Sequence, residues 1–240
     1  MQHQTNPTRA AGLGPPGLAH GQFAVVTGGG PLHPGAASAV GPGVFVIAAD
    51  SGLDHALGAG LAPGLLVGDL DSLSCDGLDW ARQRSVPIDE HPCDKDRTDT
   101  ELALATALTM GATDIVLLGG GGDRLDHTIG AISSLGHPAL ASCHSVVAHW
   151  GDSLIVIVHG PRLVTVPAAV DATVSLLALH GAAHGVSITG ARWPLADAVI
   201  QPGAGLGISN VCTADPLLVG VGSGVLTVVV PGHFEAGGQQ

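Results

Sequence analysis

Positive charge and aromatic side chains are what this chain has least of. Among its 240 residues, lysine and arginine total 8, tyrosine is absent, and tryptophan and phenylalanine number 3 each. The formal net charge of −12 leaves no basic surface for nucleic acid or an anionic membrane, so we expect neither partner. An anionic substrate would be repelled unless a metal ion bridged it to the protein. With so few aromatic residues, the core has to be built mainly from Val, Leu, Ile and Ala.

Long apolar segments and paired cysteines are also missing. No apolar run is long enough to span a bilayer. Residues 1–22 lack the apolar region of a signal peptide, and we predict that they form a disordered tail. The cysteines, at positions 75, 93, 143 and 212, are scattered and form no CxxC pair. Such a pattern favours a reducing compartment, so we predict a cytoplasmic protein.

The acidic residues are concentrated in one part of the chain. Hydrophobic residues make up 45% of the sequence, which is typical of a globular protein. Thirteen of the 20 acidic residues nevertheless lie between Asp69 and Asp126, and the only lysine, Lys95, lies among them. A merely solvated surface would spread and mix its charges. This segment is therefore the first candidate for a functional site.

The first half of the chain alternates strand-like and helix-like segments. The runs at 23–26, 44–49, 65–68 and 115–120 predict buried strands. Helices are predicted at 51–60, 98–111 and 125–135, and Thr98 with Glu101 forms a capping box. Alternation of this kind predicts parallel βαβ units. Ligands bind such sheets beyond the carboxyl ends of the strands.

The second half contains only strand-like runs separated by Gly and Pro turns. They begin at residues 153, 162, 173, 185, 207, 216 and 225. The sequence therefore predicts an α/β fold with a parallel-sheet N-terminal domain, followed by an antiparallel all-β sandwich domain. The predicted divisions are a tail at 1–22, an α/β domain at 23–148, a β-sandwich at 149–232 and a loose tail at 233–240.

Two aspartates follow the predicted strand at 65–68. Asp69 and Asp71 are two residues apart and would point the same way on an extended chain. Paired carboxylates with a neighbouring hydroxyl suit Mg²⁺, which prefers oxygen ligands. A plain turn would also account for Gly and Asp at these positions.

A second charged cluster, 94–99, leads into the predicted helix at 98–111. The start of a helix attracts anions, and Lys95 or Arg97 could pair with a phosphate. Asp99 in a first helical turn is equally explained by compensation of the helix dipole. That explanation does not account for the only lysine lying among three aspartates.

A third cluster follows the strand at 115–120. Residues 119–122 are glycines, and Arg124 could hold phosphate oxygens beside them. Asp126 and His127 could belong to the site or could cap the next helix. The glycines at 28–30 form a similar but weaker pattern, which we interpret as a loop. Because the acidic and glycine clusters follow predicted parallel strands, we expect them to meet at one edge of the sheet.

These motifs resemble those of the thiamine pyrophosphokinase family. The family pattern reads Ala-Asp-Gly-Gly, Gly-Asp-x-Asp-Ser, Lys-Asp-x-Thr-Asp and Gly-Gly-Arg-x-Asp-His. The corresponding segments of this chain, in the same order and spacing, are 49–52, 68–72, 95–99 and 122–127. Residues 185–195 and 207–210 resemble the family's β half. The resemblance extends over about residues 23–231.

The resemblance implies a Mg²⁺-dependent transfer of the pyrophosphoryl group of ATP to the hydroxyl of thiamine, which gives thiamine diphosphate and AMP. It also implies that the enzyme works as a homodimer. It implies that Asp69, Asp71 and Asp99 hold Mg²⁺ and orient the attacking hydroxyl. Phosphoryl-type transfer needs a proton acceptor, for which Asp71 is the candidate. The implied nucleotide-binding residues are Asp50, Lys95, Asp96, Thr98, Arg124, Asp126 and His127. The implied thiamine-binding residues are Trp193, Ser209 and Asn210, which would make their contacts across the dimer interface.

The chain departs from the family pattern at three places. Asp123 stands where the family has glycine, Ser51 replaces the first glycine of Ala-Asp-Gly-Gly, and Gly130-Ala131 replaces Ala-Asn. These changes concern the expected nucleotide contacts and leave the aspartates of the metal cluster intact.

Other interpretations remain open at this point. The same transfer to a hydroxymethyl pterin would use a similar metal cluster, although Trp193, Ser209 and Asn210 favour thiamine, a cationic ring that could stack on Trp193. Trp193 could instead be a core residue of the β domain. A non-catalytic nucleotide sensor would be expected to lose some of Asp69, Asp71 and Asp99, and none is lost. A purely structural role for the β domain is neither supported nor excluded.

Overall fold

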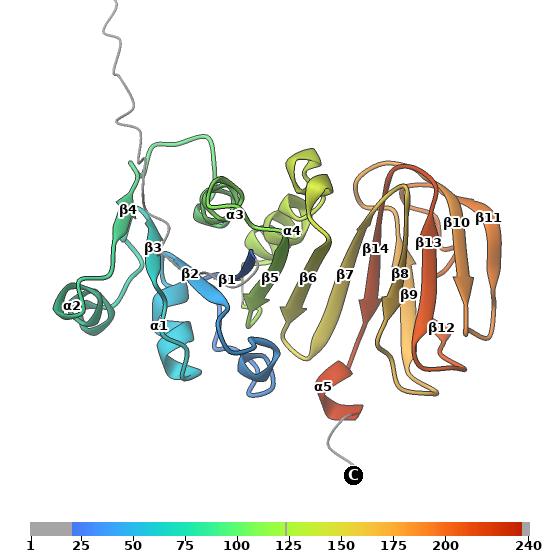
Figure 1. Cartoon of the computed structure of the whole chain (residues 1–240), viewed down its shortest axis with the longest axis horizontal. Coiled ribbons are helices and arrows are strands. Elements are labelled where there is room, and N and C mark those ends of the chain that lie inside the picture. Colours follow the sequence, from blue (N-terminus) through green and yellow to red (C-terminus); the bar gives the residue numbers. More distant parts are fainter. Residues whose placement is uncertain (1–20, 123, 237–240) are drawn as a thin grey trace, which may run out of the picture.

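The computed structural model describes residues 21–122 and 124–236. The predicted N-terminal tail up to residue 20, Asp123 and residues 237–240 lie outside the described residues. Two sheets organise the described chain (Figure 1). One has ten strands in the order β12-β9-β14-β7-β6-β5-β1-β2-β3-β4, and the other has four in the order β11-β10-β13-β8.

The N-terminal half combines parallel strands with helices. Its strands are β1 (Gln22–Val26), β2 (Phe45–Ala49), β3 (Leu65–Gly68), β4 (Ile88–Glu90), β5 (Asp114–Gly119) and β6 (Ser145–Trp150). Its helices are α1 (Gly52–Gly58), α2 (Cys75–Gln83), α3 (Asp99–Thr109) and α4 (Leu125–Ser134), with short 3-10 turns η1 (Ala37–Ala39) and η2 (Pro138–Ser142). Along the sheet, from β4 through β3, β2, β1 and β5 to β6, each pair of neighbouring strands is parallel.

The C-terminal half is antiparallel. Its strands are β7 (Ser153–His159), β8 (Arg162–Val166), β9 (Thr173–Leu177), β10 (Ala183–Thr189), β11 (Leu195–Ile200), β12 (Asn210–Val211), β13 (Leu217–Val221) and β14 (Val225–Val230), followed by the short helix α5 (His233–Ala236). β7, β14, β9 and β12 extend the large sheet, and the other four strands form the second sheet. The predicted α/β fold followed by an antiparallel sandwich is confirmed.

Successive side chains of the parallel strands point to opposite faces of the sheet, and both faces are buried. Phe23 and Val25 of β1 belong to the core that contains α3 residues, whereas Ala24 and Val26 pack with Ala56 of α1. Figure 1 shows α3 and α4 on one side of the sheet and α1 and α2 on the other. A strand that is buried on both faces has a continuous run of apolar residues, which is why these strands could be predicted from the sequence.

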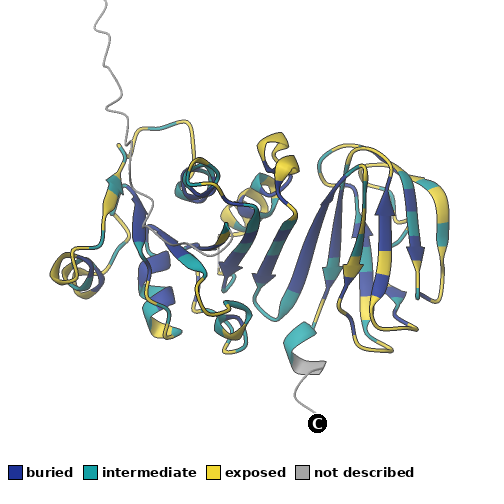
Figure 2. Ribbon diagram, viewed as in Figure 1, coloured by how far each residue is buried: buried dark blue, intermediate teal, exposed yellow. Residues whose placement is uncertain are grey.

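The sandwich encloses a separate core. Val158 and Val228 of the large sheet pack in the same cluster as Ile188 and Val219 of the small one. Figure 2 shows this burial along the strands of both sheets. No helix among the described residues is long and apolar enough to cross a lipid bilayer.

Several elements differ from the sequence expectation. α2, β4, β6 and β11 were not expected. The run at 207–211 forms strand only at Asn210–Val211, and the predicted loose tail from residue 233 starts with α5. The predicted boundary at 149 lies beside the β6–β7 turn, where the two strands pair directly within one sheet.

Candidate functional site

A cavity of about 710 Å³ lies where β1, β2, β3 and β5 end. Strand β1 lies between β2 and β5. The chain adds β2, β3 and β4 on one side of β1 and then crosses back to add β5 and β6 on the other side. Such a switch point is where ligands bind in α/β sheets. The lining includes nine of the residues proposed from sequence: Asp50, Asp69, Asp71, Lys95, Thr98, Asp99, Arg124, Asp126 and His127. Asp96 is exposed and lies outside this lining.

Three carboxylates and one ammonium group cluster in the cavity lining, and a fourth carboxylate lies at the rim. Lys95 Nζ lies 2.7 Å from Asp69 Oδ2 and 3.0 Å from Asp99 Oδ1. Carboxylate oxygens of Asp50, Asp69 and Asp99 all lie within 4.8 Å of one another. Asp71 lies at the exposed rim, next to Asp69. The cluster therefore keeps a net negative charge even after its contact with lysine.

The charges of this cluster act on one another. Burial raises the pKa of Asp50, and the carboxylates of Asp99, Asp69 and Asp71 add to that rise. The hydrogen bond from Lys95 lowers the pKa of Asp69. Desolvation opposes the charge of Lys95, but its hydrogen bonds to Asp69 and Asp99 raise its pKa overall. A bound cation would relieve the repulsion among these carboxylates.

The backbone around Asp69 brings the carboxylates together by a turn. Leu70 has φ of 65°, so the segment is not extended, and the sequence argument from an extended chain was wrong in its geometry. The backbone N–H of Asp71 donates to Asp69 Oδ1 at 3.4 Å across this turn. Gly68 has φ of 149°, and a Cβ there would lie 3.1 Å from Asp99 Oδ1. Glycine at this position therefore allows the strand end to approach the carboxylate of Asp99.

The start of α3 fixes Asp99 against the cavity. Thr98 Oγ1 accepts a hydrogen bond from the N–H of Glu101 at 3.2 Å, and Glu101 Oε2 accepts one from the N–H of Thr98 at 2.8 Å. The predicted capping box is thus confirmed. The hydroxyl of Thr98 also donates to Glu101 Oε2, so it is occupied by the cap in this structure.

Two glycine loops pack against each other on the opposite wall. A Cβ on Gly29 would lie 2.6 Å from the carbonyl oxygen of Gly121, which is too close for a real side chain. Thr27, at the end of β1, hydrogen-bonds Thr100 of α3 at 2.7 Å between their hydroxyl oxygens. The glycines at 28–30, which the sequence marked only as a loop, thus supply part of the cavity lining through Gly28 and Gly29.

Arg124 is held by its own neighbour. Its Nε and Nη2 donate to the two carboxylate oxygens of Asp126 at 3.0 Å and 2.7 Å. This fork lowers the pKa of Asp126 and raises that of Arg124. The N-cap position of α4 is Arg124, without a side-chain cap, so neither Asp126 nor His127 is the N-cap of α4.

The residues proposed for thiamine lie in the β half and not in this cavity. Trp193 is 56% exposed, so it is not a core residue. Asn210 is buried and holds the Trp193 backbone: its Oδ1 accepts from the Trp193 N–H at 3.1 Å, and its Nδ2 donates to the Trp193 carbonyl at 2.7 Å. Ser209 has φ of 57°, and its N–H donates to Ser175 Oγ at 3.1 Å.

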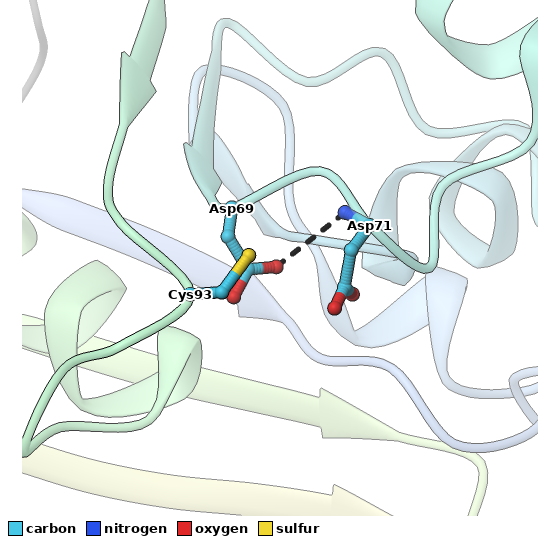
Figure 3. Close-up of side chains that lie close together, drawn as sticks. All are labelled: Asp69, Asp71 and Cys93. Atoms are coloured by element: carbon cyan, nitrogen blue, oxygen red, sulfur yellow. Dashed lines mark hydrogen bonds between the residues drawn. The ribbon is translucent and has the colours of Figure 1, made fainter.

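Sequence reasoning missed several side chains of the cavity, among them Cys93, Trp150, Thr100 and Thr128. Cys93 lies on the β4–α3 loop with its thiol close to Asp69 and Asp71 (Figure 3). The negative charge of Asp69 raises the pKa of the Cys93 thiol. Trp150, at the end of β6, also lines the cavity. Trp150 could have been found by extending the rule for strand ends to β6, whereas no motif marks Cys93.

Two protein-family models match the chain. The model described as thiamin pyrophosphokinase, catalytic domain, matches residues 42–147. The model described as thiamin pyrophosphokinase, vitamin B1 binding domain, matches residues 163–226. A search of curated proteins by sequence gives no significant match.

Solved structures of similar fold include enzymes from bacteria and yeast. Thiamine pyrophosphokinase from Bacillus subtilis superposes with a TM-score of 0.75 at 23% identity, over 88% of this chain and 99% of the other. Thiamin pyrophosphokinase from Geobacillus thermodenitrificans gives 0.72 at 26% identity, over 88% and 97%. Thiamin pyrophosphokinase from Candida albicans gives 0.69 at 13% identity, over 88% and 89%. The matches from Bacillus subtilis and Candida albicans, both below 25% identity, are likenesses of fold alone.

Proposed function

Because the chain belongs to the thiamin pyrophosphokinase family and is an enzyme of that kind, we propose that it transfers the pyrophosphoryl group of ATP to the hydroxyl of thiamine. The products are thiamine diphosphate and AMP. The observation that carries the proposal is that Asp50, Asp69, Asp71 and Asp99 line one cavity with Lys95 at the sheet's switch point. The match of residues 163–226 to a vitamin B1 binding domain favours thiamine over a pterin as the acceptor.

The residues of the cavity fit a magnesium ion. Their donors are carboxylate oxygens, which Mg²⁺ prefers. Asp50 is only 9% exposed, and its Oδ1 has no hydrogen-bond partner among the described residues. An unpaired buried carboxylate oxygen is costly unless a ligand satisfies it. We propose that Asp69, Asp71 and Asp99 hold the ion, with Asp50 facing it from the end of β2.

The chain's own residues then have distinct tasks. When bound, Mg²⁺ would neutralise phosphate oxygens that the acidic chain would otherwise repel. Asp71, at the exposed rim, accepts the proton of the attacking hydroxyl. Lys95 and Arg124 supply positive charge to the phosphates, and the glycine loops leave room for them. Thr98 acts by holding the first turn of α3, and with it Asp99.

The position of Trp193 favours a thiamine contact made across a dimer interface. Trp193 lies in the loop between β10 and β11, at the end of the molecule opposite the α/β half (Figure 1). A thiamine at the cavity would therefore meet the exposed Trp193 of a partner protomer more readily than that of its own. We propose a homodimer in which Trp193 and Ser209 contact thiamine across the interface and Asn210 positions Trp193.

The four free cysteines support a cytoplasmic location.

The reaction is tested by mixing the purified protein with thiamine, ATP and Mg²⁺. We expect AMP and thiamine diphosphate in equal amounts. The appearance of ADP in place of AMP would show that a single phosphoryl group is transferred and would refute the proposal.

Asp71 is tested by a matched pair of substitutions. Asp71→Asn should lower kcat by about 100-fold or more, the lower range of general base catalysis, while circular dichroism shows a folded protein. Asp79→Asn makes the same change at an exposed position of α2 outside the cavity lining and should keep the wild-type rate. Equal rates for the two variants would remove Asp71 from the mechanism.

A further inference from the structure

Trp150 is the only tryptophan or phenylalanine that lines the cavity among the described residues. It is the last residue of β6, is half-buried and pairs in register with Gly119 of β5. A Cβ on Gly119 would lie 2.4 Å from Cζ3 of the indole, so glycine there lets the ring rest directly on the strand end. The indole N–H of Trp150 makes no hydrogen bond among the residues that the structure describes. The ring is therefore held in place beside the cavity with its donor unused.

The parallel strands place Trp150 in one line with the rest of the site. One row of residues in register crosses the sheet, formed by Leu66, Ala48, Val26, Leu118 and His149. Within three residues after this row come Asp69 on β3, Asp50 on β2, the two glycine loops on β1 and β5, and Trp150 on β6. Four strand intervals separate β3 from β6 (Figure 1), which amounts to roughly 19 Å. The carboxylates thus lie at one end of the line, the glycine loops in the middle and the indole at the other end.

We propose that Trp150 binds the base of the nucleotide by stacking, while the phosphates extend along the glycine loops toward the carboxylates. This inference rests on the proposed function, which assigns the carboxylate end of the cavity to the transferred phosphates. A nucleoside triphosphate separates its base from its terminal phosphate by a ribose and two further phosphates, which is the order of surfaces along this sheet edge. Aromatic side chains stack on any base, because every base has a π face.

Two other roles for Trp150 give different expectations. The ring also packs against the core below the cavity, so it could serve the fold alone. Loss of a purely structural ring would disturb all ligands of the cavity, with or without a base. A ring that instead stacked on thiamine would affect the acceptor and leave the nucleotide unchanged. Inorganic tripolyphosphate separates these cases, since it carries the phosphates of ATP without the base.

Binding is tested by calorimetry on the full chain with Mg²⁺ and without thiamine. Trp150→Leu should bind ATP at least about fivefold more weakly than the wild type, the lower range of base stacking, and should bind tripolyphosphate equally well. Trp150→Phe keeps a ring and should recover most of the affinity for ATP. Trp80→Leu makes the same change at a half-buried position of α2 outside the cavity lining and should bind both ligands as the wild type does. Unchanged ATP affinity in Trp150→Leu, or an equal loss for tripolyphosphate, would overturn the proposal.

Tryptophan fluorescence provides a second measurement that does not depend on the leucine variant. The chain has three tryptophans and no tyrosine, so its emission comes from few sources. ATP should quench the emission of the wild type, whereas tripolyphosphate should leave it unchanged. The quenching should disappear in Trp150→Phe and remain in Trp80→Phe. Quenching that persists in Trp150→Phe would show that the base lies elsewhere.

Turnover separates this inference from the proposed function. With thiamine present, Trp150→Leu should raise the KM for ATP and leave the KM for thiamine unchanged. A rise in the KM for thiamine alone would assign the ring to the acceptor and overturn the base contact. If the protein transferred no pyrophosphoryl group but the ATP and tripolyphosphate affinities behaved as expected, the proposed function would fail and the base contact would stand.

Discussion

At the scale of single residues, a buried imidazole joins the C-terminal helix to the sheet. His149 of β6 is 7% exposed, and its ring centroid lies 5.0 Å from that of Phe234 in α5. Phe234 in turn stacks on His33 at 4.9 Å. His149 Nδ1 is buried without a hydrogen-bond partner among the described residues. Burial, with a smaller effect of His233, lowers the pKa of His149 to about 4.

This pKa predicts acid sensitivity. A histidine held neutral in the folded state takes up its proton on unfolding between pH 6.5 and about 4. The free energy of unfolding should therefore fall as the pH drops through this window, by about 3 kcal/mol from His149 alone. Urea denaturation at pH 7, 5.5 and 4.5 measures the fall.

The contribution of His149 is isolated by substitution. His149→Leu cannot take up a proton, so its stability should decline less between pH 7 and 4.5 than that of the wild type. The same replacement at the exposed His144 is the control and should preserve the wild-type decline. If His149→Leu and the wild type lost equal free energy over this range, His149 would not be the source of the acid sensitivity.

At the scale of elements, the first turn of α3 links stability to the site. Thr98→Ala removes the oxygen that accepts from the N–H of Glu101, and we expect it to lower the free energy of unfolding by about 1 kcal/mol. Thr98→Ser keeps that oxygen and should stay close to the wild type in urea denaturation. Equal losses in both variants would show that the methyl group of Thr98, and not the cap, carries the effect.

The elements that the sequence predicts are those with strong local signals. The apolar runs of β1, β2 and β3 and the capping box of α3 each lie within a few residues of chain, so their patterns can be read directly. β4 has only three residues at a sheet edge, and β11 also lies at an edge with few buried side chains. β4 depends on pairing with β3 across α2, which no local pattern records. β11 pairs with the preceding β10 but buries only Ile200, so it shows no apolar pattern.

The residues of the candidate site also divide into those that have a local sequence signal and those that have none. Asp69, Asp99 and Arg124 could be brought together from sequence because they follow parallel strands or begin a helix, and these positions converge in any such sheet. The turn at Leu70 could not be predicted, because an unusual φ is imposed by the surroundings of that residue. Cys93 could not be predicted either, since its approach to Asp69 depends on how two loops pack.

At the scale of the whole molecule, the separation of Trp193 from the acidic cavity leads to a complementation test. Asp71→Asn and Trp193→Ala should each be nearly inactive alone. In a mixed dimer with sites shared between protomers, one site has both changes and the other has neither. After subunit exchange, the mixture should therefore recover roughly a quarter of the wild-type rate under random pairing.

Each variant mixed with itself is the control for that experiment. If the site lay within one protomer, every site in the mixture would carry one of the two changes, and exchange would restore nothing. A mixture with no more activity than its separate components would thus assign Trp193 to its own chain or to no site.

The uninterrupted sheet from β4 to β12 also restricts how the enzyme can move. Enzymes built of two hinged lobes close on their ligands by rotation about a few linker residues. Here the two halves are joined by the ladder between β6 and β7, in which Val147 pairs with Val156 and His149 with Leu154. Rotation at that place would break the ladder. Within one chain, a hinge motion between the α/β half and β7 is therefore not expected, and Asp69 and β7 should keep a fixed separation.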